Sequence, residues 1–445
     1  MDDKALLLSL GFVRPSRHEV ADSFGDAFTG IESRKGARRR LFDERSTIGL
    51  MLGQALDRNA PCKSAVRRLQ IEFGEDASSS TAAYCKARRR VRIAAVKEMS
   101  RQISDETVKL CSFGGFGHVN ALDATSFQAD DSDANRAEWP YAPGQKPGCG
   151  FPVIGAMVSH SLVGGGSEVL VTAPWNAHDF RLFVAAEEHF GEGDLEIGDR
   201  AFCSFAAFAI LAERKADGIF RGRDWCMRTR PDDITLGEGD RITHWRKPSP
   251  SNMKAVAKTR SDEFPSEITV RVITARIRVR GFRDEEIIVV TSLLDDREFP
   301  KETILEWYLR RWEIEVSFRD VKTTLRYEFV RGRSPDIVKL EIEIVFLAYN
   351  LMRYVMSRGS PGRTKPRLGI ASTAAAVRSL LAVLQTVVKS GRSCARAFAR
   401  LIKVVASDPL EKRKRRMNVR AVKRRPKPYR LLTKSRREYQ PEECL

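Results

Sequence analysis

The sequence predicts a mixed α/β protein in which a β-rich insertion interrupts the core and helical regions flank it. Two short apolar runs, residues 119–123 and 195–199, each end in an aspartate and are typical of strands. Residues 267–294 alternate in polarity at a period of two around an Arg-Gly-Phe-Arg turn, which favours an antiparallel hairpin. Residues 304–326 contain neither proline nor glycine and predict one helix of about six turns.

The composition indicates a globular protein that binds a polyanion. The chain has 445 residues and a formal net charge of +19, so nucleic acid is the first partner to expect. No window approaches the roughly 20 apolar residues of a membrane span, and the N-terminus lacks the features of a secretory signal. Eight scattered cysteines without a CxxC pair argue against zinc and favour a reduced, cytoplasmic location. Within the cytoplasm, the protein is expected to be associated with the nucleoid.

The N-terminal region is predicted to be helical, with helices near residues 46–56 and 64–73. Serine and threonine residues near position 80 are suitable N-caps for a following basic helix that carries Arg88 and Arg89. A helix of this kind often docks on duplex DNA through phosphate contacts. A solvated arginine face on a structural helix is the alternative, and the sequence leaves both open.

Two aspartates are predicted to end strands of the core. Val119, Ala121 and Asp123 share one face of a strand, and Asp123 lies near its end. After a strand pair in residues 150–172 and a helix near 178–190, Asp199 stands where the next apolar run stops. A lone aspartate at a strand end usually forms a turn. Two of them, followed by a helix that carries a glutamate, make a more specific set.

The insertion contains arginines and tryptophans that are candidates for DNA contact. Arg276, Arg278 and Arg280 are expected on one face of the hairpin, where they meet a phosphate backbone or form a solvated sheet face. The polar stretch before the hairpin contains Trp225 and Trp245 and is expected to add short strands.

The helix predicted at residues 304–326 aligns several polar groups. Tyr308, Glu315 and Lys322 are seven residues apart, and Arg311 lies one turn from Tyr308, so these side chains return to nearly the same face. A hydroxyl, a guanidinium, a carboxylate and an ammonium in one line suit a phosphodiester held beside a metal ion. On spacing alone, a solvated and salt-bridged helix face remains the alternative.

The C-terminal part is expected to contain a helix near residues 334–357, a linker, and two helices near 371–388 and 394–405 that pack on each other or on a second subunit. Residues 412–437 hold fourteen Lys or Arg and no acid, so this tail is expected to bind phosphates non-specifically.

The expected regions are a helical DNA-binding region 1–105, a first core part 106–218, a β-rich insertion 219–300, a second core part 301–357, a helical region 358–410 and a basic tail 411–445.

Asp123, Asp199 and Glu315 are candidate metal ligands. Two adjacent strands and a packed helix can bring them together, and carboxylate oxygens suit Mg²⁺ or Mn²⁺. Two such ions roughly 3.5–4 Å apart activate an attacking oxygen and stabilise a leaving one in phosphodiester chemistry. Clustering three carboxylates without cations is unfavourable, so the set predicts bound metal.

The spacing Tyr308-x2-Arg311-x3-Glu315-x6-Lys322 resembles the signature of the IS4 family of DDE transposases. LDATSF, GDRAFCSF, VTSLLDD and LAYNLMR are similar to other stretches of that family, and the resemblance extends over about residues 78–437. Ala124 and Ala201 depart from the pattern, because they stand where glycine is expected.

The resemblance implies an RNase H-like core that binds two Mg²⁺ or Mn²⁺ ions through Asp123, Asp199 and Glu315. Such enzymes act on double-stranded DNA: they hydrolyse it at the terminal inverted repeats of an insertion sequence and transfer the freed 3′-hydroxyls to target DNA. In related enzymes excision passes through a hairpin end. Synapsis of two ends implies at least a homodimer.

The resemblance also assigns roles in DNA binding. Tyr308 and Arg311 are expected to contact phosphates near the cleavage point and to help hold a displaced base, and Lys322 is expected to contact the backbone. A tryptophan of the insertion, Trp245 or Trp225, is expected to stack on that base. A catalytically inactive, transposon-derived DNA-binding protein and an RNase H-like nuclease for RNA or repair intermediates are the competing interpretations.

Overall fold

The computed structural model describes residues 42–73, 80–111, 116–141, 148–253, 255–277, 285–360, 368–389, 394–410 and 438. These residues fall into two compact units. We call the first the helical unit; it lies within Met1–Gly115, Val158–Val169 and Trp312–Leu410. We call the second the sheet unit; it lies within Phe116–Met157, Leu170–Arg311 and Glu411–Leu445. Residues 278–284 and 411–437, which include Arg278, Arg280 and the basic tail, lie outside the described residues.

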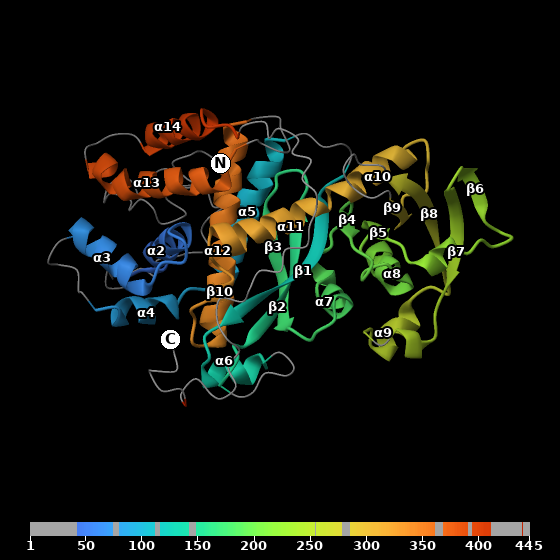
Figure 1. Cartoon of the computed structure of the whole chain (residues 1–445), viewed down its shortest axis with the longest axis horizontal. Helices are drawn as coiled ribbons and strands as arrows, with labels where there is room; N and C mark the ends of the chain where they lie inside the picture. The colour runs from blue at the N-terminus through green and yellow to red at the C-terminus, as the bar shows by residue number, and fades with distance from the viewer. Residues whose placement is uncertain are drawn as a thin grey trace. The chain divides into compact units, whose positions relative to one another are not determined.

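The helical unit is organised around one long, buried helix, α12. α5 and α2 pack against α12 (Figure 1). The helices of the unit and its short strand β10 are α2 (Glu44–Leu56), α3 (Cys62–Phe73), α4 (Ala82–Arg88), α5 (Ile93–Lys109), α11 (Trp312–Arg319), the π-helical turn η6 (Asp320–Thr324), β10 (Phe329–Val330), α12 (Pro335–Arg358), α13 (Ile370–Lys389) and α14 (Cys394–Ala406).

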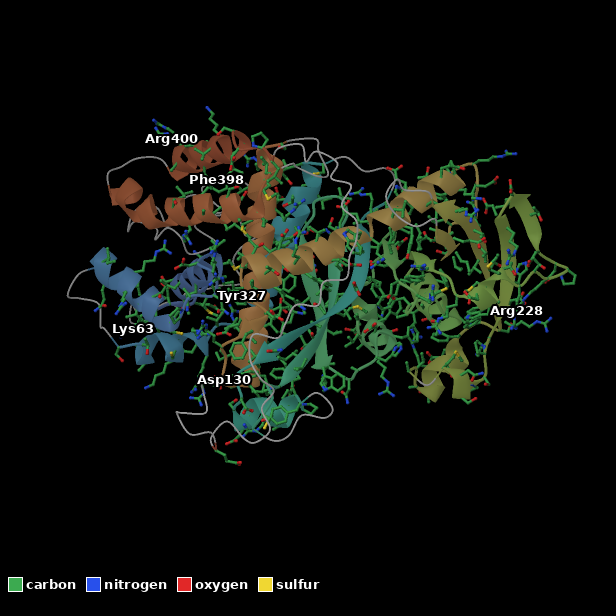
Figure 2. All side chains as sticks on the ribbon, in the orientation of Figure 1. Lys63, Asp130, Arg228, Tyr327, Phe398 and Arg400 are labelled. Carbon is green, nitrogen blue, oxygen red and sulfur yellow. The ribbon has the colours of Figure 1, made fainter. Side chains whose placement is uncertain are left out.

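Polar and aromatic contacts fix these helices to one another. The Asn350 side chain on α12 donates to Ser100 Oγ on α5 and to the Ser167 carbonyl, each at 2.9 Å. Phe398 on α14 (Figure 2) is 1 % exposed. Its ring stacks on that of Tyr354 of α12. The predicted C-terminal helices are therefore present, and α13 packs on α14.

The sheet unit contains a mixed sheet with the strand order β3-β2-β1-β4-β5-β9-β8-β7-β6. β4 pairs in parallel with β1 and β5, whereas β9, β8 and β7 continue the sheet as antiparallel neighbours (Figure 1). β2 and β3 contribute residues to both units. The strands are β1 (Val119–Ala129), β2 (Val153–Ser161), β3 (Ser167–Pro174), β4 (Leu195–Gly198), β5 (Asp217–Arg221), β6 (Ile234–Gly237), β7 (Asp240–Arg246), β8 (Glu267–Ile277) and β9 (Glu285–Thr291).

Helices of the sheet unit cover this sheet. Almost every residue of α8 is buried, because its sequence FAAFAILAE is apolar on all sides, and its Phe208 packs on Phe220 of β5. A bidentate ion pair between Arg271 and Asp240, at 2.8 and 2.6 Å, joins β8 to β7 inside the unit. The helical segments are α6 (Asp133–Glu138), α7 (Asp179–Ala185), η3 (Glu187–His189), α8 (Phe205–Glu213), η4 (Asp224–Met227), η5 (Pro250–Asn252), α9 (Lys258–Glu263) and α10 (Lys301–Arg310).

The mixed α/β class with helical terminal regions is confirmed, and two of the predicted helices differ from the structure. The segment predicted as one helix over 304–326 is divided into α10, α11 and the π-helical η6. The Arg311 N–H donates to the Tyr308 carbonyl, three residues earlier, at 3.0 Å. A hydrogen bond over three residues is typical of a 3₁₀ turn, whereas an α-helix bonds over four. Within the helical unit, the π-helical turn η6 changes the regular helical period between Glu315 and Lys322.

The basic helix predicted around Arg88 is also interrupted. α4 ends at Arg88, Arg89 follows it, and Arg92 precedes α5 with an extended backbone (ψ 120°). The arginine run thus occupies the turn between two helices. Within the described ranges, no helix combines the length and the apolar character needed to cross a membrane.

Candidate active site

Asp123 and Asp199 lie at the same level of two adjacent parallel strands of the sheet unit. Ala121 of β1 is paired with Ile197 of β4, and each aspartate follows its paired residue by two positions. Residues two apart project from the same face of a strand, so the aspartates share a face. Asp199 directly follows β4, as predicted, whereas Asp123 lies inside the longer β1 and beyond the stretch paired with β4.

Backbone N–H groups orient both carboxylates. The Ala124 N–H donates to Asp123 Oδ1 at 2.8 Å, and the Ala201 N–H donates to Asp199 Oδ1 at 2.7 Å. The alanines that depart from the family pattern thus supply these bonds through their main chain. Carboxylate oxygens held in this way fit the hard-ion chemistry of Mg²⁺ or Mn²⁺.

Two residues of the predicted signature lie near these aspartates within the sheet unit. Arg311 Nη1 is 3.8 Å from Asp123 Oδ2. Tyr308 on α10 is 6 % exposed and is hydrogen-bonded to the Arg311 side chain. Burial raises the pKa of Tyr308, while the charges of Arg311 and Arg221 oppose that rise.

Sequence reasoning missed two charged residues of this region, Arg221 and Asp179. Gly198 of β4 is paired in parallel with Phe220 of β5, so Arg221 ends β5 beside Asp199. Asp179 begins α7, and its pKa is raised first by burial and then by the charge of Asp199. An arginine at a strand end and an aspartate in the first turn of a helix are common, and only the sheet register gives them significance.

Glu315 and Lys322 belong to the helical unit. Glu315 lies on α11 and Lys322 in η6, and both are half-buried. Along the chain, Glu315 follows Arg311 by four residues. In the part of the chain that the structure describes, no three His, Cys, Asp or Glu residues are grouped closely enough to hold a metal ion. A three-carboxylate metal site therefore remains a prediction.

A cavity of about 600 Å³ lies in the sheet unit close to Asp199. Trp225, in η4, is 43 % exposed, whereas Trp245, on β7, is 5 % exposed and packs on Phe208. The two indole rings are 4.8 Å apart. Of these two tryptophans, Trp225 is therefore the one whose ring is accessible to a ligand. The lining also includes Phe180, Ala201 and Cys203 and four exposed arginines, Arg181, Arg223, Arg230 and Arg246.

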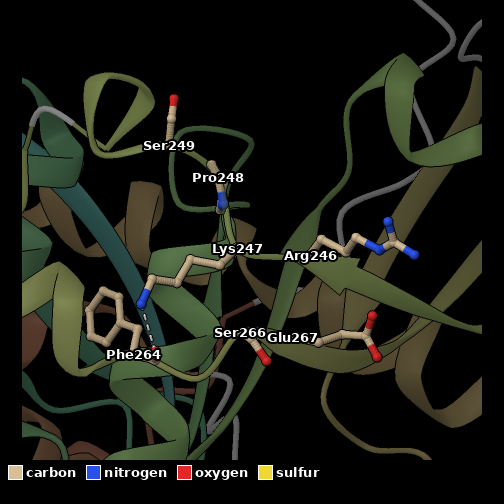
Figure 3. A pocket seen from close by; sticks show the side chains of 7 residues that line it. All are labelled: Arg246, Lys247, Pro248, Ser249, Phe264, Ser266 and Glu267. Atoms are coloured by element: carbon tan, nitrogen blue, oxygen red, sulfur yellow. Dashed lines mark hydrogen bonds between the residues drawn. The ribbon is translucent and has the colours of Figure 1, made fainter.

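A second hollow, of about 700 Å³, lies at the end of β7 (Figure 3). The Lys247 ammonium donates to the Phe264 and Asp262 carbonyls at 2.8 and 3.3 Å. These two hydrogen bonds direct the Lys247 charge toward the protein backbone. Arg246 and Glu267 carry opposite charges on the same rim. This hollow therefore has little net attraction for an anion.

The other predicted DNA contacts differ in exposure. Arg88 is 8 % exposed, and its guanidinium pairs with the buried Glu341 and donates to Cys62 Sγ at 3.0 Å. Arg88 is thus a structural residue, contrary to the expectation of a surface contact, while Arg89 is exposed. Arg276 is exposed and paired in register with Glu286. Arg228, near the cavity, is also exposed (Figure 2).

A family match gives this geometry its context. Residues 114–351, more than half of the chain, match the family described as the transposase DDE domain. The match includes both aspartates, Glu315 and Lys322. The chain belongs to this family and is an enzyme that acts on DNA.

Individual relatives narrow the class. The chain is 25 % identical over 336 residues to the transposase InsG for insertion sequence element IS4 of Escherichia coli, covering 72 % of this chain and 71 % of that protein. It is 31 % identical over 121 residues to a probable transposase for insertion sequence element IS5377 of Geobacillus stearothermophilus, covering 26 % and 31 %. The chain is an IS4-type DNA transposase, and the resemblance noted in the sequence is confirmed.

Among solved structures, a piggyBac transposase synaptic complex with hairpin DNA is similar, with a TM-score of 0.40 and 10 % identity over 93 % of this chain and 83 % of that one. At this score the similarity does not define the fold.

Proposed function

We propose that this transposase cuts DNA at the terminal inverted repeats of an insertion sequence and joins the freed 3′-hydroxyls to target DNA. The observation that carries the proposal is the pair Asp123 and Asp199, level on adjacent strands, with Arg311 Nη1 3.8 Å from Asp123 Oδ2. Two acids and a nearby cation form the recurring chemistry of sites that hold metal ions and a phosphate together.

Glu315 is the proposed third ligand. It follows Arg311 by four residues, and Arg311 is the residue that contacts Asp123. Together the three carboxylates would hold two Mg²⁺ or Mn²⁺ ions. When bound, such ions activate the attacking oxygen and stabilise the leaving oxygen of the phosphodiester.

The basic and aromatic residues are proposed to position the DNA. The guanidiniums of Arg311 and Arg221 would bind non-bridging oxygens of the scissile phosphate, and Lys322 would contact the backbone. Tyr308, hydrogen-bonded to Arg311, would fix the orientation of that guanidinium. Arg89 and Arg276 would contact phosphates farther from the cleavage point.

The cavity beside Trp225 is the proposed site for a displaced base. The exposed indole offers a stacking surface, and the surrounding arginines offer charge to the phosphates on either side. Trp245, buried beneath Trp225, would support that ring and would not itself meet DNA.

We also propose an RNase H-like core formed by residues 106–218 and 301–357, with residues 219–300 as an insertion and 1–105 as a DNA-binding region. Two ends must be held together during transposition, so a homodimer is expected. The contact is proposed on the helical region 358–410, where Val404 of α14 is 60 % exposed.

The experiment that tests this function uses purified full-length protein and a duplex that carries the inverted repeat, labelled at one strand end. We expect nicking at the repeat terminus with Mg²⁺ or Mn²⁺ and none with EDTA, followed by joining to a plasmid target. A duplex with a scrambled terminus is the control. Binding without nicking would instead indicate an inactive DNA-binding protein, and nicking that ignores the repeat would indicate a general nuclease.

A further inference from the structure

Within the helical unit, the turn between α2 and α3 is hydrogen-bonded to the end of residues 304–326, which we call the signature segment. Asn59 Nδ2 donates to the Phe329 carbonyl at 2.7 Å and to the Arg326 carbonyl at 3.3 Å. In return, Arg331 Nε donates to the Asn59 carbonyl at 3.2 Å. One amide of the N-terminal region therefore satisfies two carbonyls that lie 267 and 270 residues further along the chain.

The local backbone fixes Asn59 in place for this contact. Asn59 is 8 % exposed, and its φ of 59° lies in the left-handed region, which asparagine tolerates better than most residues. Gln54 of α2 closes the turn, because its Nε2 donates to the Ala60 carbonyl at 2.7 Å and its own carbonyl accepts from the Ala60 N–H at 3.1 Å. A closed turn therefore sets the direction of the Asn59 side chain.

The other side of the contact belongs to the turn that follows η6. Arg326 has a φ of 60°, a conformation that an arginine adopts only where its surroundings impose it. The Tyr327 N–H donates to the Val321 carbonyl at 3.2 Å, which ties this turn to η6. Lys322 lies in η6 as well. A shift of the Arg326 carbonyl would therefore be passed to the backbone that carries Lys322.

Hydrogen bonds, more than apolar packing, hold this junction. A cavity of about 70 Å³ borders it and is lined by Asn59 and Tyr327 among others (Figure 2), so side chains do not fill the space completely. Glu341 of α12 anchors the stretch beyond, since it accepts from the Arg331 and Gly332 N–H groups at 2.8 and 2.9 Å. Along the chain, the carbonyls that Asn59 binds lie between that anchor and η6.

We propose that Asn59 is a positioning residue for DNA cleavage, because it holds the end of the signature segment and thereby orients Lys322. This role rests on the proposed contact of Lys322 with the DNA backbone. The N-terminal region then sets the rate of cleavage in addition to binding DNA. Lys63, an exposed cation in the first turn of α3, lies four residues from Asn59 (Figure 2). A duplex that contacts Lys63 is linked to η6 through this single turn.

Three variants of the full-length protein separate the amide from the backbone of the turn. Asn59→Gly removes both donated hydrogen bonds and keeps the left-handed backbone, which glycine adopts freely. Asn59→Asp keeps the shape of the side chain, but an ionised carboxylate can only accept hydrogen bonds. Arg58→Gly is the matched control, because Arg58 is exposed, has a φ of 54° and leaves the neighbouring amide in place.

Single-turnover cleavage of the labelled repeat at saturating protein measures the effect. We expect both Asn59 variants to cleave about tenfold more slowly than the wild type, with a change of less than about twofold in the Kd for the duplex, because a reacting group is misplaced and not lost. Arg58→Gly should cleave at the wild-type rate. A wild-type rate in Asn59→Gly would overturn the proposal.

A double-mutant cycle distinguishes an action through Lys322 from a general loss of stability. In a Lys322→Ala background, Asn59→Gly should cause no further loss of cleavage, because two residues that act through one contact are not additive. A further loss of about tenfold in the double variant would indicate independent effects and would overturn the positioning role.

Hydrogen–deuterium exchange requires no cleavage and therefore keeps this proposal separate from the proposed function. We expect the backbone amides of residues 320–331 to exchange faster in Asn59→Gly than in the wild type, with no change in Arg58→Gly. Unchanged exchange in Asn59→Gly would overturn the proposal. Absence of cleavage by the wild type would instead count against the proposed function, while exchange of this segment still decides whether Asn59 holds it.

Discussion

Arg311 Nη1 lies 3.8 Å from Asp123 Oδ2, so a cation of the signature segment stands beside a strand carboxylate. Both side chains are mostly covered, at 18 % and 23 % exposure, which limits the screening of their attraction by water. An arginine in this position can hold a phosphate oxygen next to the carboxylates that bind metal.

The first prediction concerns Arg311. Arg311→Ala should lower the cleavage rate by about 100-fold, because one preformed cation aimed at the reacting phosphate is lost. Arg311→Lys should fall between this variant and the wild type, since lysine keeps the charge but lacks the two-pronged donor. Single-turnover cleavage of the labelled repeat measures both. A wild-type rate in Arg311→Ala would remove the residue from the site.

The second prediction separates the two tryptophans of the cavity. Trp225→Ala should weaken binding of a single-stranded oligonucleotide by about 1–3 kcal/mol with little change in stability, because its exposed face is the stacking surface. Trp245→Ala should cost about 3–5 kcal/mol of unfolding free energy, because a buried ring is lost from the core. Fluorescence titration and urea unfolding distinguish them. Equal effects of both variants on stability would refute this division.

The third prediction separates two neighbouring arginines. Arg88→Ala should destabilise the protein by about 3–5 kcal/mol, because it leaves the Glu341 carboxylate buried without its partner. Arg89→Ala should leave stability unchanged and reduce the salt dependence of DNA binding by about one phosphate contact. Urea unfolding and binding at several salt concentrations provide the measurements. A stable Arg88→Ala variant with a flatter salt slope would reverse the assignment.

The fourth prediction is a pH dependence of stability. Burial raises the pKa of Glu343 to about 7, although Lys97 Nζ lies 3.6 Å away and opposes the rise. An unfolded glutamate titrates near about 4.3, so between these values the folded state holds a proton that the unfolded state has lost. The free energy of unfolding should therefore fall as pH rises from about 4.5 to about 7, by at most about 3.5 kcal/mol.

Glu343→Gln should reduce that fall and should be more stable than the wild type at pH 8, as measured by urea unfolding at pH 5 and pH 8. The pH dependence of stability should become smaller in this variant without vanishing, because burial also raises the pKa of Glu168, which lies close enough to Glu343 and Lys97 to interact with their charges. An identical pH slope in the variant and the wild type would show that Glu343 does not carry the effect.

Local patterns were sufficient for much of the fold. Alternation identified the β8–β9 hairpin, and apolar runs ending in aspartate located β4 and the positions of Asp123 and Asp199. The break at Arg311 was not predictable, because a single 3₁₀ turn within a helix requires neither proline nor glycine. The expected placement of Asp123 at a strand end was wrong, because β1 continues beyond it to Ala129. Asp199, by contrast, does follow the end of the short strand β4.

Residues whose role depends on distant partners could not be found from sequence. Arg88 is one of several arginines in a run, and only the position of Glu341 on α12 makes it a buried ion pair. Arg221 and Asp179 gain significance only from the register and packing around Asp199. The domain boundaries and the convergence of Glu315 with the two aspartates stay predictions.

The most direct measurement is cleavage of the labelled inverted repeat by Glu315→Gln, with Glu306→Gln as the matched control on an exposed position of α10. If Glu315 completes the metal site, Glu315→Gln should bind the duplex with an unchanged Kd and show no cleavage in Mg²⁺ or Mn²⁺, while Glu306→Gln cuts normally. Cleavage by Glu315→Gln at a rate near that of the wild type would contradict a three-carboxylate centre.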